Sequence, residues 1–129
     1  MSKPRQVLLV DDDPDVIRGA SLRLRAAGYD TISAADGAQG VATAVDQHPD
    51  AILLDVRMPR MDGLAALEKL QENEDTKSIP IVMLSASLVD QQKALEAGAR
   101  YFLTKPYQGN TLLTAVESAM TEHNISESE

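Results

Sequence analysis

Five polar side chains stand directly after four short apolar runs of this chain: Asp11 and Asp12 after 6–10, Asp55 after 51–54, Ser85 after 81–84, and Lys105 after 101–104. Runs this short and branched predict buried strands. If the strands are parallel neighbours, their carboxyl ends share one edge of a sheet, which is where open α/β folds bind ligands. Three carboxylates, a hydroxyl and an ammonium are then expected to converge on one spot.

The three carboxylates of this set point to a metal ion. Asp11, Asp12 and Asp55 would repel one another at one sheet edge and raise each other's pKa unless a positive charge lay between them. Mg²⁺ suits such a site, because it prefers oxygen ligands and keeps several waters and phosphate oxygens in its shell. Mn²⁺ accepts similar ligands. We therefore expect a divalent cation here, Mg²⁺ first.

The same residues suggest phosphoryl chemistry. With a metal held by Asp11 and Asp12, the Asp55 carboxylate could attack phosphorus and form an aspartyl phosphate. Lys105 would neutralise charge on the transferring group, and Ser85 could donate a hydrogen bond to one of its oxygens. By contrast, Asp13 before Pro14 is expected to be a helix cap.

The intervening segments have helical spacing and alternate with the apolar runs. Apolar residues recur every three or four positions within 14–27, 37–48, 64–72, 88–97 and 112–120, and Gly28 follows the first of these segments as a C-cap would. A further strand is expected at 30–34, and the fourth at 79–84. Strict alternation predicts a parallel sheet with helices on both faces. We expect a single domain over 1–129, with its core at about 6–120 and a frayed polar tail at 121–129.

Composition excludes several kinds of site and several classes of protein. The 129 residues contain no cysteine, which excludes disulfides and thiolate metal sites. No apolar run approaches the roughly 20 residues that span a bilayer. The net charge of −8 opposes binding to a phosphate backbone, and the few aromatic residues do not suffice for stacking bases. We expect a cytoplasmic protein that binds neither membrane nor nucleic acid directly.

The chain resembles the receiver domain of bacterial response regulators, and in particular the stand-alone receivers of chemotaxis. The motifs that carry the resemblance are LLVDD at 8–12, LDVRMP at 54–59, MDG at 61–63, MLSA at 83–86, AGA at 97–99 and TKP at 104–106. The resemblance implies a doubly wound, flavodoxin-like fold with five parallel strands in the order 2-1-3-4-5 and five helices.

It also implies roles for individual residues. Asp55 would be the phosphoacceptor, Asp12 a direct metal ligand, and Asp11 either a ligand through water or general acidic support. Asp55 and the backbone carbonyl of Arg57 would complete the metal's protein ligands. Ser85 would be the switch hydroxyl, and Lys105 would contact the phosphoryl group.

Three further expectations follow from the resemblance. The Lys105–Pro106 bond is expected to be cis. Phe102 stands where the family has its switch aromatic, although a core ring is an equally good interpretation of that residue. Arg57 and Ser87 could tune dephosphorylation, or could be two exposed polar residues.

The function implied is a phosphorylation switch without turnover of an external substrate. A sensor histidine kinase or histidine phosphotransfer protein would supply the phosphoryl group. The face formed by the last two helices and the fifth strand would control a protein target or a linked output domain. One alternative is an aspartate-nucleophile phosphohydrolase using Asp11, which needs a late acidic pair that the sequence lacks after Lys105. Another is a binding module that kept the fold without phosphorylation.

Overall fold

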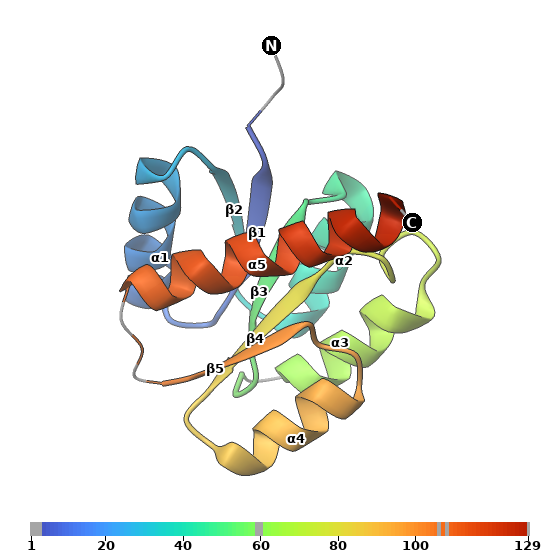
Figure 1. Cartoon of the computed structure of the whole chain (residues 1–129). Coiled ribbons are helices and arrows are strands. Elements are labelled where there is room, and N and C mark those ends of the chain that lie inside the picture. Colours follow the sequence, from blue (N-terminus) through green and yellow to red (C-terminus); the bar gives the residue numbers. More distant parts are fainter. Residues whose placement is uncertain (1–3, 59–60, 106, 108, 129) are drawn as a thin grey trace.

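Strands and helices alternate along the chain in the computed structural model (Figure 1), which describes residues 4–58, 61–105, 107 and 109–128, with side chains to residue 121. The elements are β1 (Gln6–Val10), α1 (Pro14–Ala26), β2 (Asp30–Ala34), α2 (Gly37–Gln47), β3 (Ala51–Asp55), α3 (Gly63–Glu72), β4 (Ile81–Ser85), α4 (Leu88–Glu96), β5 (Tyr101–Thr104) and α5 (Gly109–Ser128). The predicted alternation is confirmed.

The five strands form one parallel sheet in the order β2-β1-β3-β4-β5. The register pairs Val10 with Leu54, Asp55 with Leu84, and Ser85 with Thr104. The strands therefore end almost level with one another at their carboxyl ends. This order and the helices on both faces confirm the predicted doubly wound, flavodoxin-like fold.

Side chains of the inner strands alternate between two apolar layers, because successive residues of a strand point to opposite faces. One layer lies under α2, α3 and α4, and its strand residues include Leu8, Val10, Ile52, Leu54, Ile81 and Met83. The other lies under α1 and α5, and its strand residues include Val7, Leu9, Leu53, Val82 and Leu84. Both faces of the central strands are thus covered, which explains why the strands read as continuous apolar runs.

Local signals fix the start and end of α1. The Asp13 carboxylate accepts a hydrogen bond from the Asp15 amide at 2.9 Å, and Pro14 is the first helical residue. Gly28 follows the helix with a φ of 99°, a left-handed conformation that glycine adopts without strain. The predicted cap and stop are both confirmed.

The bounds of β4 differ from those expected. β4 begins at Ile81 rather than at Ile79 and runs through Ser85, because Pro80 has no amide to donate to a ladder. Thr76, in the polar segment after α3, is fully buried, and its hydroxyl donates to the Leu70 carbonyl at 2.7 Å. That bond satisfies a carbonyl near the end of α3, so the segment is folded against the helix rather than merely trailing from it.

Helix α5 continues beyond Met120 to Ser128. The predicted fraying of 121–129 concerns how easily this end of the chain opens, and it stays a prediction. Among the described residues, no helix combines the length and the apolar character needed to cross a membrane.

Candidate functional site

The carboxyl ends of β1, β3 and β5 bring an ammonium group between two buried carboxylates. The Lys105 Nζ lies 2.8 Å from Asp55 Oδ1 and 3.8 Å from Asp11 Oδ2. The Lys105 backbone amide donates to the Ser85 carbonyl at 2.9 Å, which extends the β4–β5 ladder to the lysine. The sheet register therefore places Asp11, Asp55 and Lys105 together as the sequence predicts.

Asp12 completes a cluster of three carboxylates. Asp11, Asp12 and Asp55 each offer an oxygen within 4.8 Å of the others. Asp11 and Asp55 are buried, with 5% and 4% of their surface exposed, whereas Asp12 is exposed. Asp11 Oδ1 accepts the Asp13 amide at 2.9 Å, while Asp11 Oδ2 is buried and has no hydrogen-bond partner among the described residues.

Burial and crowding shift the protonation of this cluster. Burial, with smaller effects from the Asp55 and Asp12 charges, raises the pKa of Asp11 to about 6 despite the Asp13 amide and Lys105. Burial also raises the pKa of Asp55 more than its bond to Lys105 lowers it. Burial lowers the pKa of Lys105, but its bond to Asp55 and the two acidic charges outweigh this, so the net shift is upward. The cluster thus carries excess negative charge that the lysine only partly offsets.

The donor set fits a magnesium ion. Its oxygens are those of carboxylates, which Mg²⁺ prefers, and one of them, Asp11 Oδ2, is buried without a hydrogen bond from the described residues. Burial first, and mutual repulsion second, raise the pKa of Asp11 and Asp55, and a divalent cation would offset both effects. The cluster is therefore a candidate metal site.

The Ser85 hydroxyl, which was expected to face the acceptor, is turned elsewhere. Its Oγ donates to Asp90 Oδ2 at 2.7 Å and accepts the Ser87 amide at 3.1 Å. Ser85 is 2% exposed. The described residues thus use both the donor and an acceptor position of this hydroxyl without Asp55.

Arg57 lies two residues beyond Asp55, and its side chain reaches α4. Its Nε and Nη2 donate to Asp90 Oδ2 and Oδ1 at 3.0 and 3.2 Å. The sequence interpretation missed Asp90, since an acid in the first turn of a helix is ordinarily solvated. One signal was available: Asp90 stands four residues before Ala94, and these two are the buried residues of α4.

Phe102 is partly buried and packs on the apolar layer that also holds α4. Its neighbours in sequence, Tyr101 and Leu103, pack on the other layer. Phe102 is therefore on the same side of the sheet as Asp90. The predicted cis bond between Lys105 and Pro106 lies outside the described residues.

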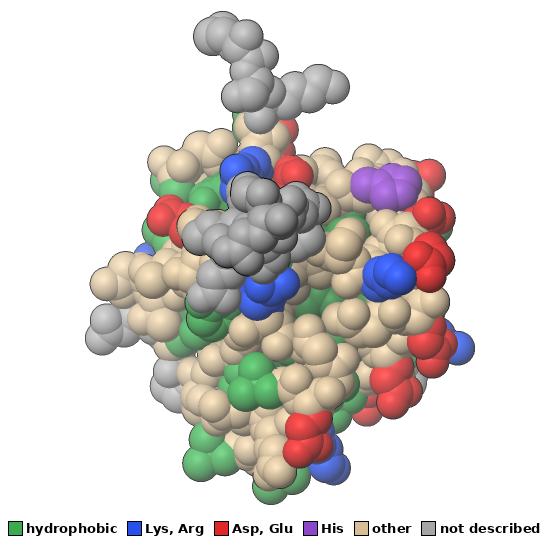
Figure 2. All heavy atoms as spheres, turned by 45° about the vertical axis from the view of Figure 1, so that its right-hand side comes forward, with side chains coloured by type: hydrophobic (Ala, Val, Ile, Leu, Met, Phe, Trp, Pro, Cys, Tyr) green, Lys and Arg blue, Asp and Glu red, His purple; other side chains and the backbone are tan. Residues whose placement is uncertain are grey.

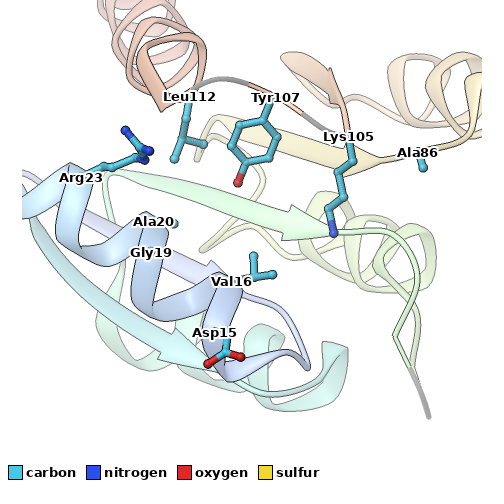
Figure 3. A pocket seen from close by; sticks show the side chains of 9 residues that line it. All are labelled: Asp15, Val16, Gly19, Ala20, Arg23, Ala86, Lys105, Tyr107 and Leu112. Atoms are coloured by element: carbon cyan, nitrogen blue, oxygen red, sulfur yellow. The ribbon is translucent and has the colours of Figure 1, made fainter.

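A groove of about 500 Å³ opens beside the carboxylates, between α1 and the segment after β5 (Figure 3). Asp15, Val16 and Arg23 line it from α1, and Lys105 and Tyr107 from the opposite side. In Figure 3 the Tyr107 hydroxyl points into this space, and the Lys105 ammonium lies by the end of β3. Burial raises the pKa of Tyr107, so the phenol stays protonated at neutral pH. The groove leaves the Lys105 side of this sheet edge open.

Comparison with protein families identifies the chain. The family model described as "Response regulator receiver domain" matches residues 7–117. The chain belongs to the response regulator receiver family. The resemblance seen in the sequence motifs is thereby confirmed.

Individual relatives agree with this membership. The transcriptional regulator RpaA of Synechocystis sp. is 37% identical over 117 residues, which are 89% of this chain and 48% of RpaA. Protein PilG of Pseudomonas aeruginosa is 36% identical over 115 residues, which are 88% of this chain and 85% of PilG. The chain thus spans about half the length of RpaA but most of PilG.

A solved structure offers a comparison at the site itself. The receiver domain of sensor histidine kinase PA1611 from Pseudomonas aeruginosa has a TM-score of 0.85 and is 32% identical, covering 92% of this chain and 98% of that one. Its crystal structure has a magnesium ion coordinated in the active site cleft. The present receiver domain has a cluster of three carboxylates, a donor set that suits the same kind of ion.

Proposed function

We propose that this receiver domain is a phosphoacceptor switch in which Asp55 carries the phosphoryl group. The observation that supports this most is the ion pair of buried Asp55 with Lys105 at 2.8 Å, beside Asp11 and Asp12. One carboxylate is thereby held against a cation at a sheet edge that a groove leaves accessible. Such a carboxylate can act as a nucleophile toward phosphorus.

The transfer follows from these positions. A carboxylate oxygen of Asp55 attacks the phosphorus of a phosphohistidine, the P–N bond breaks, and the imidazole nitrogen keeps the bond's electrons and takes up a proton. The Lys105 ammonium neutralises charge on the phosphoryl oxygens. Asp11, Asp12 and the Arg57 carbonyl would hold Mg²⁺ with Asp55, and the ion would supply positive charge to the same oxygens.

A sensor histidine kinase or a histidine phosphotransfer protein would be the donor, bound at the groove next to Lys105 and Tyr107. A cytoplasmic location and the absence of turnover of an external substrate belong to the same proposal. The acidic net charge of −8 argues against direct contact with nucleic acid.

The signal would leave through α4, β5 and α5. The added charge would draw Ser85 and Lys105 inward, and Phe102 would turn toward the space that Ser85 leaves. Leu88 and Val89 of α4 are 70% and 65% exposed, and Figure 2 shows hydrophobic side chains in the lower part of the molecule, at the height of α4 in Figure 1. A protein target or a linked output domain would bind there.

Magnesium-dependent labelling by acetyl phosphate tests the acceptor. Wild-type protein should gain one phosphoryl group by intact mass, and Asp55→Asn should gain none because an amide is not a nucleophile of this kind. Asp46→Asn, an exposed acid of α2, should label like the wild type. Labelling that persists in Asp55→Asn would reject the assignment.

A further inference from the structure

A buried carboxylate on α4 competes for the hydroxyl that the phosphoryl group is expected to recruit. Asp90 is 3% exposed, and both of its oxygens are engaged: Oδ1 by Arg57 Nη2, and Oδ2 by Arg57 Nε and Ser85 Oγ. The Ser85–Asp90 contact, at 2.7 Å, is the shortest of the three. A short, buried hydrogen bond to a charged acceptor is among the stronger kinds.

The Ser85 hydroxyl can donate only one hydrogen bond, because it has a single proton. In this structure it donates that bond to Asp90, and it accepts a hydrogen bond from the Ser87 amide. Ser85 therefore cannot donate to a phosphoryl oxygen on Asp55 until it breaks its bond to Asp90. Asp90 keeps Arg57 as a partner when that happens, so the buried carboxylate is not left unpaired.

We propose that Asp90 is a positioning residue that, held by Arg57, keeps the Ser85 hydroxyl turned away from Asp55 and so sets how readily the phosphorylated conformation forms. The inference rests on the proposed function of Asp55 and adds that Asp90 competes with the phosphoryl group for the Ser85 hydroxyl.

Through its contact with Asp90, the Arg57 side chain connects the segment after β3 to α4. Arg57 lies two residues after the acceptor, and its guanidinium holds the first turn of α4 through Asp90. Loss of the Ser85 bond leaves Asp90 attached to the β3 side through Arg57 alone among the described hydrogen bonds. The free energy of the Ser85–Asp90 hydrogen bond therefore opposes the binding of any phosphoryl group that has to recruit Ser85.

Beryllofluoride, a phosphoryl mimic, measures this balance when its affinity for the Mg²⁺-loaded protein is determined by calorimetry. Asp90→Ala should bind it about 10-fold to 100-fold more tightly than the wild type, the range expected for a hydrogen bond to a charged group. Asp90→Asn, which keeps the side-chain volume but is a weaker acceptor, should lie between the two. It also carries the test if the alanine variant does not fold.

A double-mutant cycle separates this role from a merely structural one. In a Ser85→Ala background, Asp90→Ala should change beryllofluoride affinity less than twofold, because no hydroxyl remains to be released. Glu96→Gln removes an exposed charge from the same helix and should leave affinity unchanged. An unchanged or weaker affinity in both Asp90 variants, or a gain that persists without Ser85, overturns the proposal.

The outcomes also distinguish the two levels of inference. If wild-type protein neither binds beryllofluoride nor labels on Asp55, the proposed function is wrong. If the wild type does both and the Asp90 variants match it, only the role of Asp90 is wrong.

Discussion

Replacing Asp11 by asparagine is expected to stabilise the metal-free protein above about pH 6. Asp11 is 5% exposed, and burial first, then the Asp55 charge, raises its pKa from an ordinary 3.8 to about 6. One pKa unit corresponds to about 1.4 kcal/mol, so ionised Asp11 costs the folded state about 3 kcal/mol of unfolding free energy.

The sign of the pH dependence follows from which state holds the proton. Below about pH 4 both the folded and the unfolded chain keep Asp11 protonated, and the residue has no effect. Between about pH 4 and 6 the unfolded chain releases the proton while the folded protein retains it, so this residue makes stability fall as pH rises. Above about pH 6 the loss is complete.

Urea unfolding followed by circular dichroism, with a chelator and at about pH 8, measures the effect. Asp11→Asn should raise the unfolding free energy by about 1–3 kcal/mol, because asparagine has no charge to bury and can still accept the Asp13 amide. The loss of the attraction to Lys105 at 3.8 Å reduces this gain. The gain should shrink near pH 4. Mg²⁺ should stabilise the wild type and leave the variant nearly unchanged.

Glu68→Gln controls for net charge, since it removes one exposed acid from α3 and should change stability by less than about 0.5 kcal/mol. An Asp11→Asn protein that is equally or less stable than the wild type at about pH 8 without metal would refute the argument that burial opposes ionisation here.

Two further substitutions test the site's support. Gly63→Ala should destabilise the protein by about 1–3 kcal/mol in urea, because its Cβ would overlap the Asp55 carbonyl oxygen. Gly19→Ala on α1, where a Cβ meets nothing within 4 Å, should instead stabilise it by about 0.5–1 kcal/mol, and similar effects at both glycines would contradict the close approach. Lys105→Met should slow acetyl phosphate labelling by about 100-fold through loss of the cation beside Asp55, whereas Lys77→Met at the exposed pair with Glu74 should not; equal rates would remove Lys105 from the reaction.

Much of the fold could be read from the sequence because its signals are local. The strands before Asp11 and Lys105 are short branched runs, and capping residues such as Asp13 act within one turn of their own position. The prediction that Asp11, Asp55 and Lys105 lie together then followed, because the carboxyl ends of neighbouring parallel strands share one edge of the sheet. The strand order itself was implied by the family resemblance, since alternation alone admits several orders.

The contacts that sequence reasoning missed depend on distant segments. Asp90 is buried because Arg57, 33 residues earlier, reaches it across the sheet end. Thr76 is buried because the chain turns back on α3 and its hydroxyl finds the Leu70 carbonyl. The residues next to Asp90 and Thr76 in sequence predict that both side chains are exposed. Only the hydrogen-bond partners that packing supplies make their burial stable.

The two apolar layers of the sheet bear on how input and output can communicate. The groove beside Lys105 adjoins α1, whereas Asp90 and Phe102 lie with α4 in the opposite layer. Under the proposed function, a donor in the groove and a target on α4 would therefore occupy different sides of the sheet and need not displace each other. Thermodynamic linkage then makes their effects reciprocal: a target that prefers the phosphorylated arrangement of α4 raises the protein's hold on the phosphoryl group by the same factor.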